Sequence, residues 1–218
     1  YVNAKGGLIM PGFINTHEHI YSAMARGLSI KGYHPKGFLE ILDGQWWNID
    51  RRLTMEQIKY SAMDTIISCI RNGVTTMFDH HASFGCIKGS LFTIADVAKN
   101  MGVRACLCYE ISDRDGMEKA RESVMENAEF IRYALRDDTD MTAGMMGMHA
   151  QFTISDATME LAAAQKPKEA GYHIHVAEGI EDLHDCLKKY GKRIVDRLMD
   201  WDILGEETLL GHCIYINR

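Results

Sequence analysis

The sequence lacks the features that mark membrane-spanning and nucleic-acid-binding proteins. No stretch approaches the roughly 18 consecutive apolar residues that indicate a membrane helix. Basic side chains are not in excess either, because 24 lysines and arginines stand against 30 aspartates and glutamates, a net charge of −6. That balance argues against a broadly basic surface for nucleic acid. We therefore expect neither a membrane nor a nucleic acid among the partners.

Paired cysteines are missing as well. No Cys-x-x-Cys motif occurs, which excludes a zinc ribbon and a thioredoxin-like site. In a chain of 218 residues, cysteines scattered through apolar runs indicate reduced thiols rather than a disulfide scaffold. The six are Cys69, Cys86, Cys106, Cys108, Cys186 and Cys213. We therefore predict a cytoplasmic protein.

The composition that is present, 25% charged and 46% hydrophobic, is typical of a folded globular protein. Apolar runs alternate with amphipathic stretches from one end to the other. Six strands are predicted, at residues 8–16, 74–78, 103–109, 145–149, 172–177 and 209–213. Helices are predicted at 54–72, 90–100, 116–135, 155–167 and 180–200, the last with a break near Gly191. This alternation predicts an α/β fold with a parallel sheet, either an open doubly wound sheet or a (β/α)₈ barrel.

One connection is unusually long. Residues 20–53 show no convincing helix or strand, and such a segment in a compact α/β protein is usually a lid or binding loop. It carries Tyr33, His34, Trp46 and Trp47. The tryptophans either pin the segment to the helical layer or cover a substrate. Both interpretations stay open, and Trp46 is a candidate substrate contact.

Histidines gather at or near the carboxyl ends of five predicted strands. They are His17, His19, His80, His81, His149, His173, His175 and His212. In a parallel barrel those ends converge on the face where active sites are built, and neutral imidazole is the commonest metal ligand. The two-residue spacing of His17 and His19 places both side chains on one face of a strand. We therefore predict a metal site.

Two classes of metal enzyme are excluded by their spacing. Residues 17–21 read His-Glu-His-Ile-Tyr, so Tyr21 stands where an H-E-x-x-H zinc protease needs its second histidine. A small nucleobase deaminase needs a Pro-Cys-x-x-Cys motif, and none of Pro11, Pro35 and Pro167 precedes a cysteine.

Three motifs carry a resemblance to a known family. Residues 7–19 (GLIMPGFINTHEH) resemble the first-strand signature of the amidohydrolase superfamily. Residues 173–178 (HIHVAE) resemble the fifth-strand motif of its deaminase and chlorohydrolase branch, and residues 210–213 (LGHC) resemble the sixth-strand motif. The resemblance runs in order across the whole chain. In detail, including residues 78–83 (FDHHAS), the sequence is most similar to the SsnA group of aminohydrolases.

The resemblance implies roles for individual residues. It makes His17, His19 and His175 metal ligands, Glu178 the proton shuttle, and His212 the group that orients and polarises the attacking water or the substrate. Chemistry supports this reading. Three neutral imidazoles leave a divalent ion its full charge and one open position, and a water bound there can have a pKa of about 7. An alternative is that Glu178 only caps the following helix, where acidic residues are favoured.

The resemblance also implies where substrate binds and how many ions are present. His149 occupies the fourth-strand place of a substrate-contacting histidine. His80 and His81 are further candidates, one expected to face the pocket and the other the packing. Members with two metals carry a carboxylated lysine on the fourth strand, and no lysine stands near His149. The resemblance therefore favours one divalent ion, zinc or else iron.

Parts of the family's architecture are not expected in this chain. Both ends look cut, since the sequence begins at Tyr1 without a methionine and stops after an apolar run. We expect residues 1–7 to be a remnant of the family's small β-sandwich domain and residues 8–218 to be an incomplete (β/α)₈ barrel holding strands one to six of eight. The family's metal-binding aspartate after the eighth strand would then be absent. Such a fragment should be inactive and prone to aggregate or to need a partner.

The function that follows is a metal-dependent hydrolysis of non-peptide C–N bonds by the full-length parent. The resemblance implies deamination of an aminated heterocycle or amidine-like small molecule by hydroxide made at the metal, in an enzyme that is a homo-oligomer when full length. Two alternatives stay open: a chlorohydrolase or phosphoesterase of the same superfamily, or a non-catalytic barrel remnant whose histidines only pack.

Overall fold

Seven strands, all paired in parallel, alternate with helices in the computed structural model, which describes residues 1 and 3–217. They are β1 (Phe13–Glu18), β2 (Val74–His81), β3 (Arg104–Tyr109), β4 (Thr142–Gly144), β5 (Met146–Ala150), β6 (Tyr172–Val176) and β7 (Leu209–His212). The strands form two sheets, in the orders β1-β2-β3-β4 and β5-β6-β7. The predicted α/β class with parallel strands is confirmed. Val2, inside the expected domain range 1–7, and Arg218, the last residue of the expected range 8–218, lie outside the described residues.

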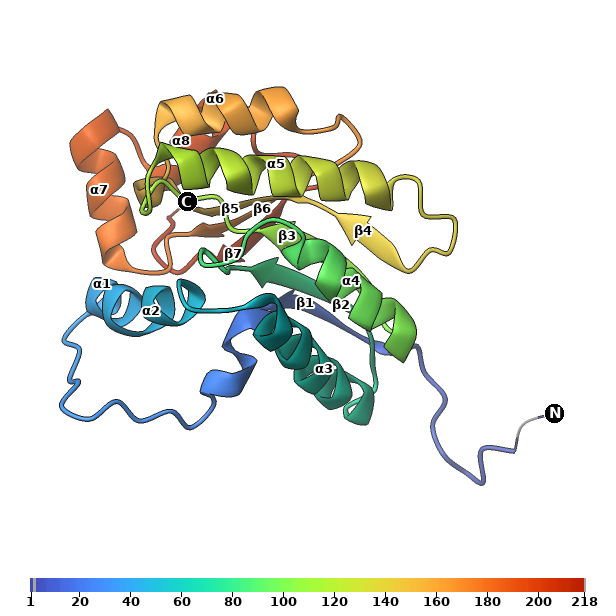
Figure 1. Ribbon diagram of the computed structural model, residues 1–218. Coiled ribbons are helices and arrows are strands. Elements are labelled where there is room, and N and C mark those ends of the chain that lie inside the picture. The colour runs from blue at the N-terminus through green and yellow to red at the C-terminus, as the bar shows by residue number, and fades with distance from the viewer. Residues whose placement is uncertain (2, 218) are drawn as a thin grey trace.

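Six longer helices connect the strands. They are α3 (Met55–Arg71), α4 (Ser90–Met101), α5 (Met117–Ala134), α6 (Asp156–Gln165), α7 (Ile180–Tyr190) and α8 (Ile194–Asp200). Figure 1 shows the strands gathered in the centre, with α5 and α6 above them and α3 below. Within the described part of the chain, no helix combines the length and apolar character needed to cross a membrane.

Helix α3 forms as the sequence predicts. The Thr54 hydroxyl accepts the Gln57 backbone N–H at 3.4 Å, and the Gln57 side chain accepts the Thr54 backbone N–H at 2.9 Å. This reciprocal capping box satisfies two amide donors that a helix start otherwise leaves without partners. Ile58 and Ile66 on the apolar face are fully buried. The helix ends before Gly73, whose φ of +75° favours glycine and turns the chain into β2.

The first strand differs from its prediction. The apolar run suggested residues 8–16, but pairing begins only where Phe13 lies beside Val74. Because β2 itself begins at Val74, nothing is available to pair with the residues before Phe13. Leu8 and Ile9 accordingly stand 88% and 77% exposed. An apolar run shows which residues suit a strand, but the neighbouring strand decides where the ladder starts.

A short strand, β4, precedes the fourth predicted strand (residues 145–149), which corresponds to β5, so seven strands stand where six were expected. β4 pairs with β3, and β5 pairs with β6. The change of partner occurs between adjacent residues, because the Met145 N–H donates to the Leu107 carbonyl and the Met146 N–H donates to the Gly171 carbonyl. Residues 142–150 therefore link the two sheets: β4 belongs to the first sheet and β5 to the second.

The long segment between β1 and α3 is not devoid of structure, so that prediction was wrong. It holds four short helical pieces: η1 (Ile20–Ala25), α1 (Phe38–Ile41), η2 (Leu42–Trp46) and α2 (Trp47–Asp50). Helices of four to six residues have almost no stability alone. Tertiary contacts stabilise them: Ile20 of η1 is fully buried, and Nη1 and Nη2 of Arg114 both reach the Asp50 carboxylate at the end of α2.

The core lies between the strands and the helices. Ile66, Leu91 and Leu107 pack α3 and α4 against the first sheet, while Ile174 and Leu198 pack the helices after β5 against the second. Burying each such side chain stabilises the fold by about 1.5–3 kcal/mol. This packing fixes the strand directions, and with them the positions of the residues at the strand ends.

A cavity of about 580 Å³ lies at the amino ends of the strands, lined by residues such as Thr76, Arg104 and Thr142. The histidines lie at the opposite, carboxyl ends. In parallel α/β folds active sites are built at the carboxyl ends, so this cavity is not expected to be the site of chemistry.

Candidate metal centre

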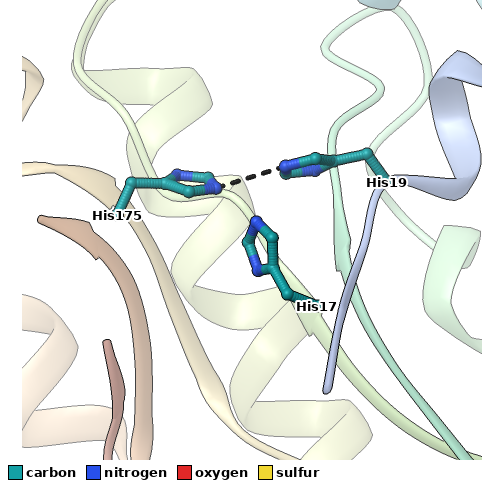
Figure 2. A group of neighbouring side chains, drawn as sticks. All are labelled: His17, His19 and His175. Carbon is teal, nitrogen blue, oxygen red and sulfur yellow. Dashed lines mark hydrogen bonds between the residues drawn. The ribbon is translucent and has the colours of Figure 1, made fainter. Parts of the chain in front are cut away.

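The ring of His17 lies at the centre of the histidine group. Its centroid is 4.7 Å from that of His19, 5.0 Å from His173, 5.1 Å from His175 and 5.3 Å from His212. These residues lie on β1, β6 and β7 or directly after β1. Strand ends that are far apart in the sequence therefore meet at one place, as in Figure 2 for three of the residues.

Main-chain carbonyls fix the tautomers of His19 and His175. The Nδ1–H of His19 donates to the His80 carbonyl at 2.8 Å, and the Nδ1–H of His175 donates to the His149 carbonyl at 2.9 Å. A carbonyl only accepts, so each Nδ1 carries the proton and each Nε2 keeps a lone pair. The two Nε2 atoms point at each other across 3.3 Å (Figure 2).

A hydrogen-bond relay sets the third imidazole. The Cys108 thiol lies 3.5 Å from the Asp79 carbonyl, His173 Nδ1 lies 3.5 Å from Cys108 Sγ, and His17 Nδ1 lies 2.9 Å from His173 Nε2. The Cys108 thiol donates to the carbonyl, so His173 Nδ1–H donates to the Cys108 sulfur. His173 Nε2 is then an acceptor, and the proton of His17 lies on Nδ1. His17 Nε2 then keeps its lone pair, and this buried atom has no partner among the described residues.

The three imidazoles are held in the neutral form that a metal needs. Burial, followed by the nearby rings of His19 and His212, lowers the pKa of His17 to about 4. Burial is also the largest cause that lowers the pKa values of His19 and His175. The ligand atoms of the three lie within 4.8 Å of one another. Three neutral nitrogen donors, one with an orphaned lone pair, fit a divalent ion.

Glu178 lies beside this group, opposite His212. Its Oε2 is 3.4 Å from His212 Nε2, and burial raises the pKa of Glu178 while His212 opposes the rise. The chain reaches this position through Ala177, whose φ is +50° and whose N–H donates to Asp182 Oδ2. The cap of α7 is Gly179, without a side-chain hydrogen bond. Glu178 is therefore not the cap of that helix.

His149 lies on the side of the group that faces the long segment. Its Nδ1 is 2.8 Å from the Thr153 hydroxyl, which itself donates to the Ala150 carbonyl. The His149 Nδ1 therefore donates, and its Nε2 keeps a lone pair. The ring of Trp47 lies 6.2 Å away, centroid to centroid. Trp46, the tryptophan chosen from the sequence, is half-buried on the preceding turn.

The neighbouring histidines of β2 point to different surroundings. His80 lies 4.3 Å from the His175 ring and donates from Nε2 to the Met148 carbonyl at 3.0 Å. His81 donates from Nε2 to the Ser83 hydroxyl at 3.0 Å and packs near Tyr109. Both rings are fully buried. His80 thus belongs to the histidine group, and His81 to the packing beneath it.

Sequence reasoning gave no role to several residues that shape this centre. His173 forms a hydrogen bond with His17. The guanidinium carbon Cζ of Arg114 lies 5.1 Å from the centroid of the Trp47 ring. For His173 a signal existed, because the spacing of two from His175 places both on one strand face. For Arg114 and its partner Asp50, 64 residues apart, no local pattern pointed to the contact.

Comparisons with known proteins bear on this geometry. The sequence profile of the Amidohydrolase family matches residues 8–218. The chain is 27% identical over its whole length to 5-methylthioadenosine/S-adenosylhomocysteine deaminase 2 of Archaeoglobus fulgidus, covering 50% of that protein. It is 27% identical to the 5'-deoxyadenosine deaminase of Methanosarcina barkeri, over 99% of this chain and 48% of that one.

A solved structure shares the fold. A zinc-bound adenosine deaminase from Xanthomonas campestris superimposes with a TM-score of 0.78 at 22% identity, over 95% of this chain and 45% of that chain. At this identity the likeness concerns the fold alone. The chain spans about half the length of the curated relatives it matches.

Proposed function

Because this chain belongs to the amidohydrolase family, we propose that the full-length protein is a metal-dependent hydrolase that deaminates an aminated heterocycle. The observation that carries the proposal is the convergence of three imidazole lone pairs beside a carboxyl group. His17, His19 and His175 supply the lone pairs, and Glu178 supplies the carboxyl group. No part of the packing alone accounts for three unprotonated nitrogens facing one another.

His17, His19 and His175 would hold one divalent ion, zinc in the first instance and iron as the alternative. Support comes from their neutral state and from the imidazole donors, which suit both metals. Bound there, the ion would supply Lewis acidity that makes a water acidic near neutral pH. An aspartate from a later strand, as the family resemblance implies, would complete the coordination.

Glu178 and His212 would manage the proton. With Oε2 3.4 Å from His212 Nε2, the Glu178 carboxylate can take a proton from water and deliver it to a ring nitrogen or to departing ammonia. His212 can hold the same water or the substrate by hydrogen bonding. The raised pKa of Glu178 suits a group that must both accept and donate.

His149 and Trp47 would bind the heterocycle. The free Nε2 lone pair of His149 can accept a hydrogen bond from a ring or amino N–H, and the Trp47 ring beside it offers a flat apolar wall. The names of the curated relatives point to adenine nucleosides as the first substrates to examine. These names do not favour the dechlorinating, phosphoester-cleaving or non-catalytic alternatives.

We further propose that the seven strands make up six of the eight positions of a (β/α)₈ barrel. The parallel order, the link between the sheets at residues 142–150, and the likeness to a deaminase fold support this. Residues 8–218 would belong to the barrel domain and residues 1–7 to the small sandwich domain, in keeping with the range of the family match.

We also propose that the full-length protein is cytoplasmic and forms a homo-oligomer. All six cysteines are free, which suits a reducing compartment. Exposed apolar side chains on and before β1, among them Ile9 and Phe13, suit burial by further protein. Light scattering of the full-length protein would give its oligomeric state.

The decisive test is an ammonia-release screen of the full-length, zinc-loaded protein against adenine nucleosides, guanine, pyrimidines and triazines. We expect release from at least one class and none with Glu178→Gln. His184→Asn, on an exposed face of α7, is the matched control and should keep full activity. Release of chloride or phosphate in place of ammonia would overturn the proposal.

A further inference from the structure

We propose that the chain has a second, inner position for a divalent cation, formed by His80, Glu110 and His175. The ligand atoms of these three residues also lie within 4.8 Å of one another, and all three side chains are buried. The inner position shares His175 with the outer set of His17 and His19. It concerns where an ion binds and does not depend on the proposed deamination.

His80 presents an unused lone pair to this position. Its Nε2–H donates to the Met148 carbonyl at 3.0 Å and lies 3.3 Å from the His173 carbonyl. Because Nε2 carries the proton, Nδ1 of the neutral ring is an acceptor. That atom is fully buried and has no partner among the described residues. A buried polar atom without a partner costs about 1–3 kcal/mol, so something should satisfy it.

The distance to Glu110 suits a metal better than a hydrogen bond. Glu110 Oε2 lies 3.8 Å from His80 Nδ1. A direct hydrogen bond would need about 2.7–3.2 Å. Zinc lies about 2.0–2.2 Å from nitrogen and carboxylate ligands, so an ion can lie between two such atoms with little movement.

The local charge also favours a cation. Arg114 forms an ion pair with Glu110, 3.6 Å from Oε1, and it already forms a two-pronged contact with Asp50. Two carboxylates therefore face one guanidinium. A bound cation would balance the second carboxylate.

Sharing His175 makes the two positions exclusive. A neutral imidazole has one lone pair, and that of His175 lies on Nε2 because Nδ1 donates to the His149 carbonyl. An ion in the inner position would leave His17 and His19 with an incomplete set. The inner position would therefore hold the ion without the two outer imidazoles, in a loaded but inactive arrangement.

Zinc titration of chelator-treated protein, followed by calorimetry and by metal analysis after gel filtration, tests this inference. The double variant His17→Asn/His19→Asn removes two outer ligands and should still retain one equivalent of zinc. Adding Glu110→Gln should abolish that retention. Glu110→Gln alone should retain one equivalent, now at the outer set.

Loss of zinc from the double variant would contradict the inner position. So would a zinc content of the double variant that does not change when Glu110→Gln is added. Circular dichroism checks that each variant is folded. If the double variant does not fold, His19→Asn alone replaces it, because the outer set then keeps only two imidazoles and the same Glu110→Gln comparison decides. A full-length enzyme without ammonia release would refute the proposed function and leave these zinc results standing.

Discussion

The Nε2 atoms of His19 and His175 face each other at 3.3 Å, although the only N–H of each ring is on Nδ1 and donates to a main-chain carbonyl. Two lone pairs in this arrangement repel unless a cation lies near them. The fold holds them there through the backbone of β2 and β5, at His80 and His149. We therefore expect a bound divalent ion to stabilise the fold as well as to serve chemistry.

Replacing His175 with asparagine should remove this ion. The variant loses a nitrogen ligand that both the outer and the inner sets require. We expect zinc retained by the unaltered chain after gel filtration to be absent from His175→Asn, and the increase in melting temperature on adding zinc to disappear. His184→Asn, which changes an exposed histidine, should behave as the unaltered chain. Equal zinc content in both variants would contradict the assignment.

His173 should act on the metal without touching it. The residue accepts the Nδ1 proton of His17 at 2.9 Å and so keeps the His17 lone pair on Nε2. Loss of such a supporting group typically lowers metal affinity about 10- to 100-fold. We expect a fall of this size for His173→Phe in a zinc competition assay. An affinity within a factor of two of the unaltered chain would argue against the relay.

Local sequence patterns predicted the elements whose causes are local. The capping box of Thr54 and Gln57 gave α3 its start, and the stripe through Ile58 and Ile66 gave it a buried face. The change of strand partner at Met145 was not predictable, because it depends on two neighbours that the sequence does not place beside it.

The metal centre likewise combines features that the local sequence predicts with features that depend on distant residues. Strand-end positions indicated which histidines would gather, since every parallel strand ends at the same edge. Which nitrogen of each ring carries the proton depends on acceptors such as the His80 carbonyl, 61 residues from His19. Trp46 was chosen over Trp47 because composition does not show which of two adjacent tryptophans, about 100° apart around a helix, faces His149.

Metal-free protein should lose stability as the pH falls below neutrality. Burial lowers the pKa values of His81 and His149 to about 3, whereas the model-peptide value is about 6.5. Between these values the unfolded chain binds protons that the folded chain does not, so stability falls as pH falls. Each histidine should contribute roughly 2–3 kcal/mol of loss between pH 6.5 and 4.5.

Urea unfolding of chelator-treated protein at pH 7.5, 6.5, 5.5 and 4.5 measures this effect. The midpoint should be level between the first two values and then fall. His81→Gln, which can still donate to Ser83, should flatten the curve. A midpoint that does not change down to pH 4.5 would contradict the buried neutral state.

Glu178→Gln should separate catalysis from metal binding in the full-length protein. Glutamine keeps the size of the side chain but cannot take the proton that the proposed reaction moves. We expect kcat for ammonia release to fall by about 10²- to 10⁴-fold. Zinc content should stay unchanged, because Glu178 lies 3.4 Å from His212 and is not among the three metal ligands. Unimpaired turnover would remove Glu178 from the mechanism.

The contact between Asp50 and Arg114 should be a main support of the segment that carries Trp47. Both side chains are almost fully buried, at 1% and 4% exposure, and Asp50 ends the short helix that begins at Trp47. Asp50→Asn leaves the guanidinium buried without its carboxylate partner. Removing one member of a buried pair costs about 3–5 kcal/mol, so urea unfolding should show a loss in this range together with a change in tryptophan fluorescence.

Matched variants distinguish this buried pair from ordinary surface charges. Asp50→Leu combined with Arg114→Met removes both charges and should recover part of the lost stability, since apolar pairs of similar volume replace buried ion pairs well, although Glu110 then loses its guanidinium partner. Arg26→Ala breaks the exposed pair with Asp64 and should cost less than about 1 kcal/mol. If Asp50→Asn proved as mild as Arg26→Ala, the segment would have to be held by other contacts, and Trp47 would lose its fixed place beside His149.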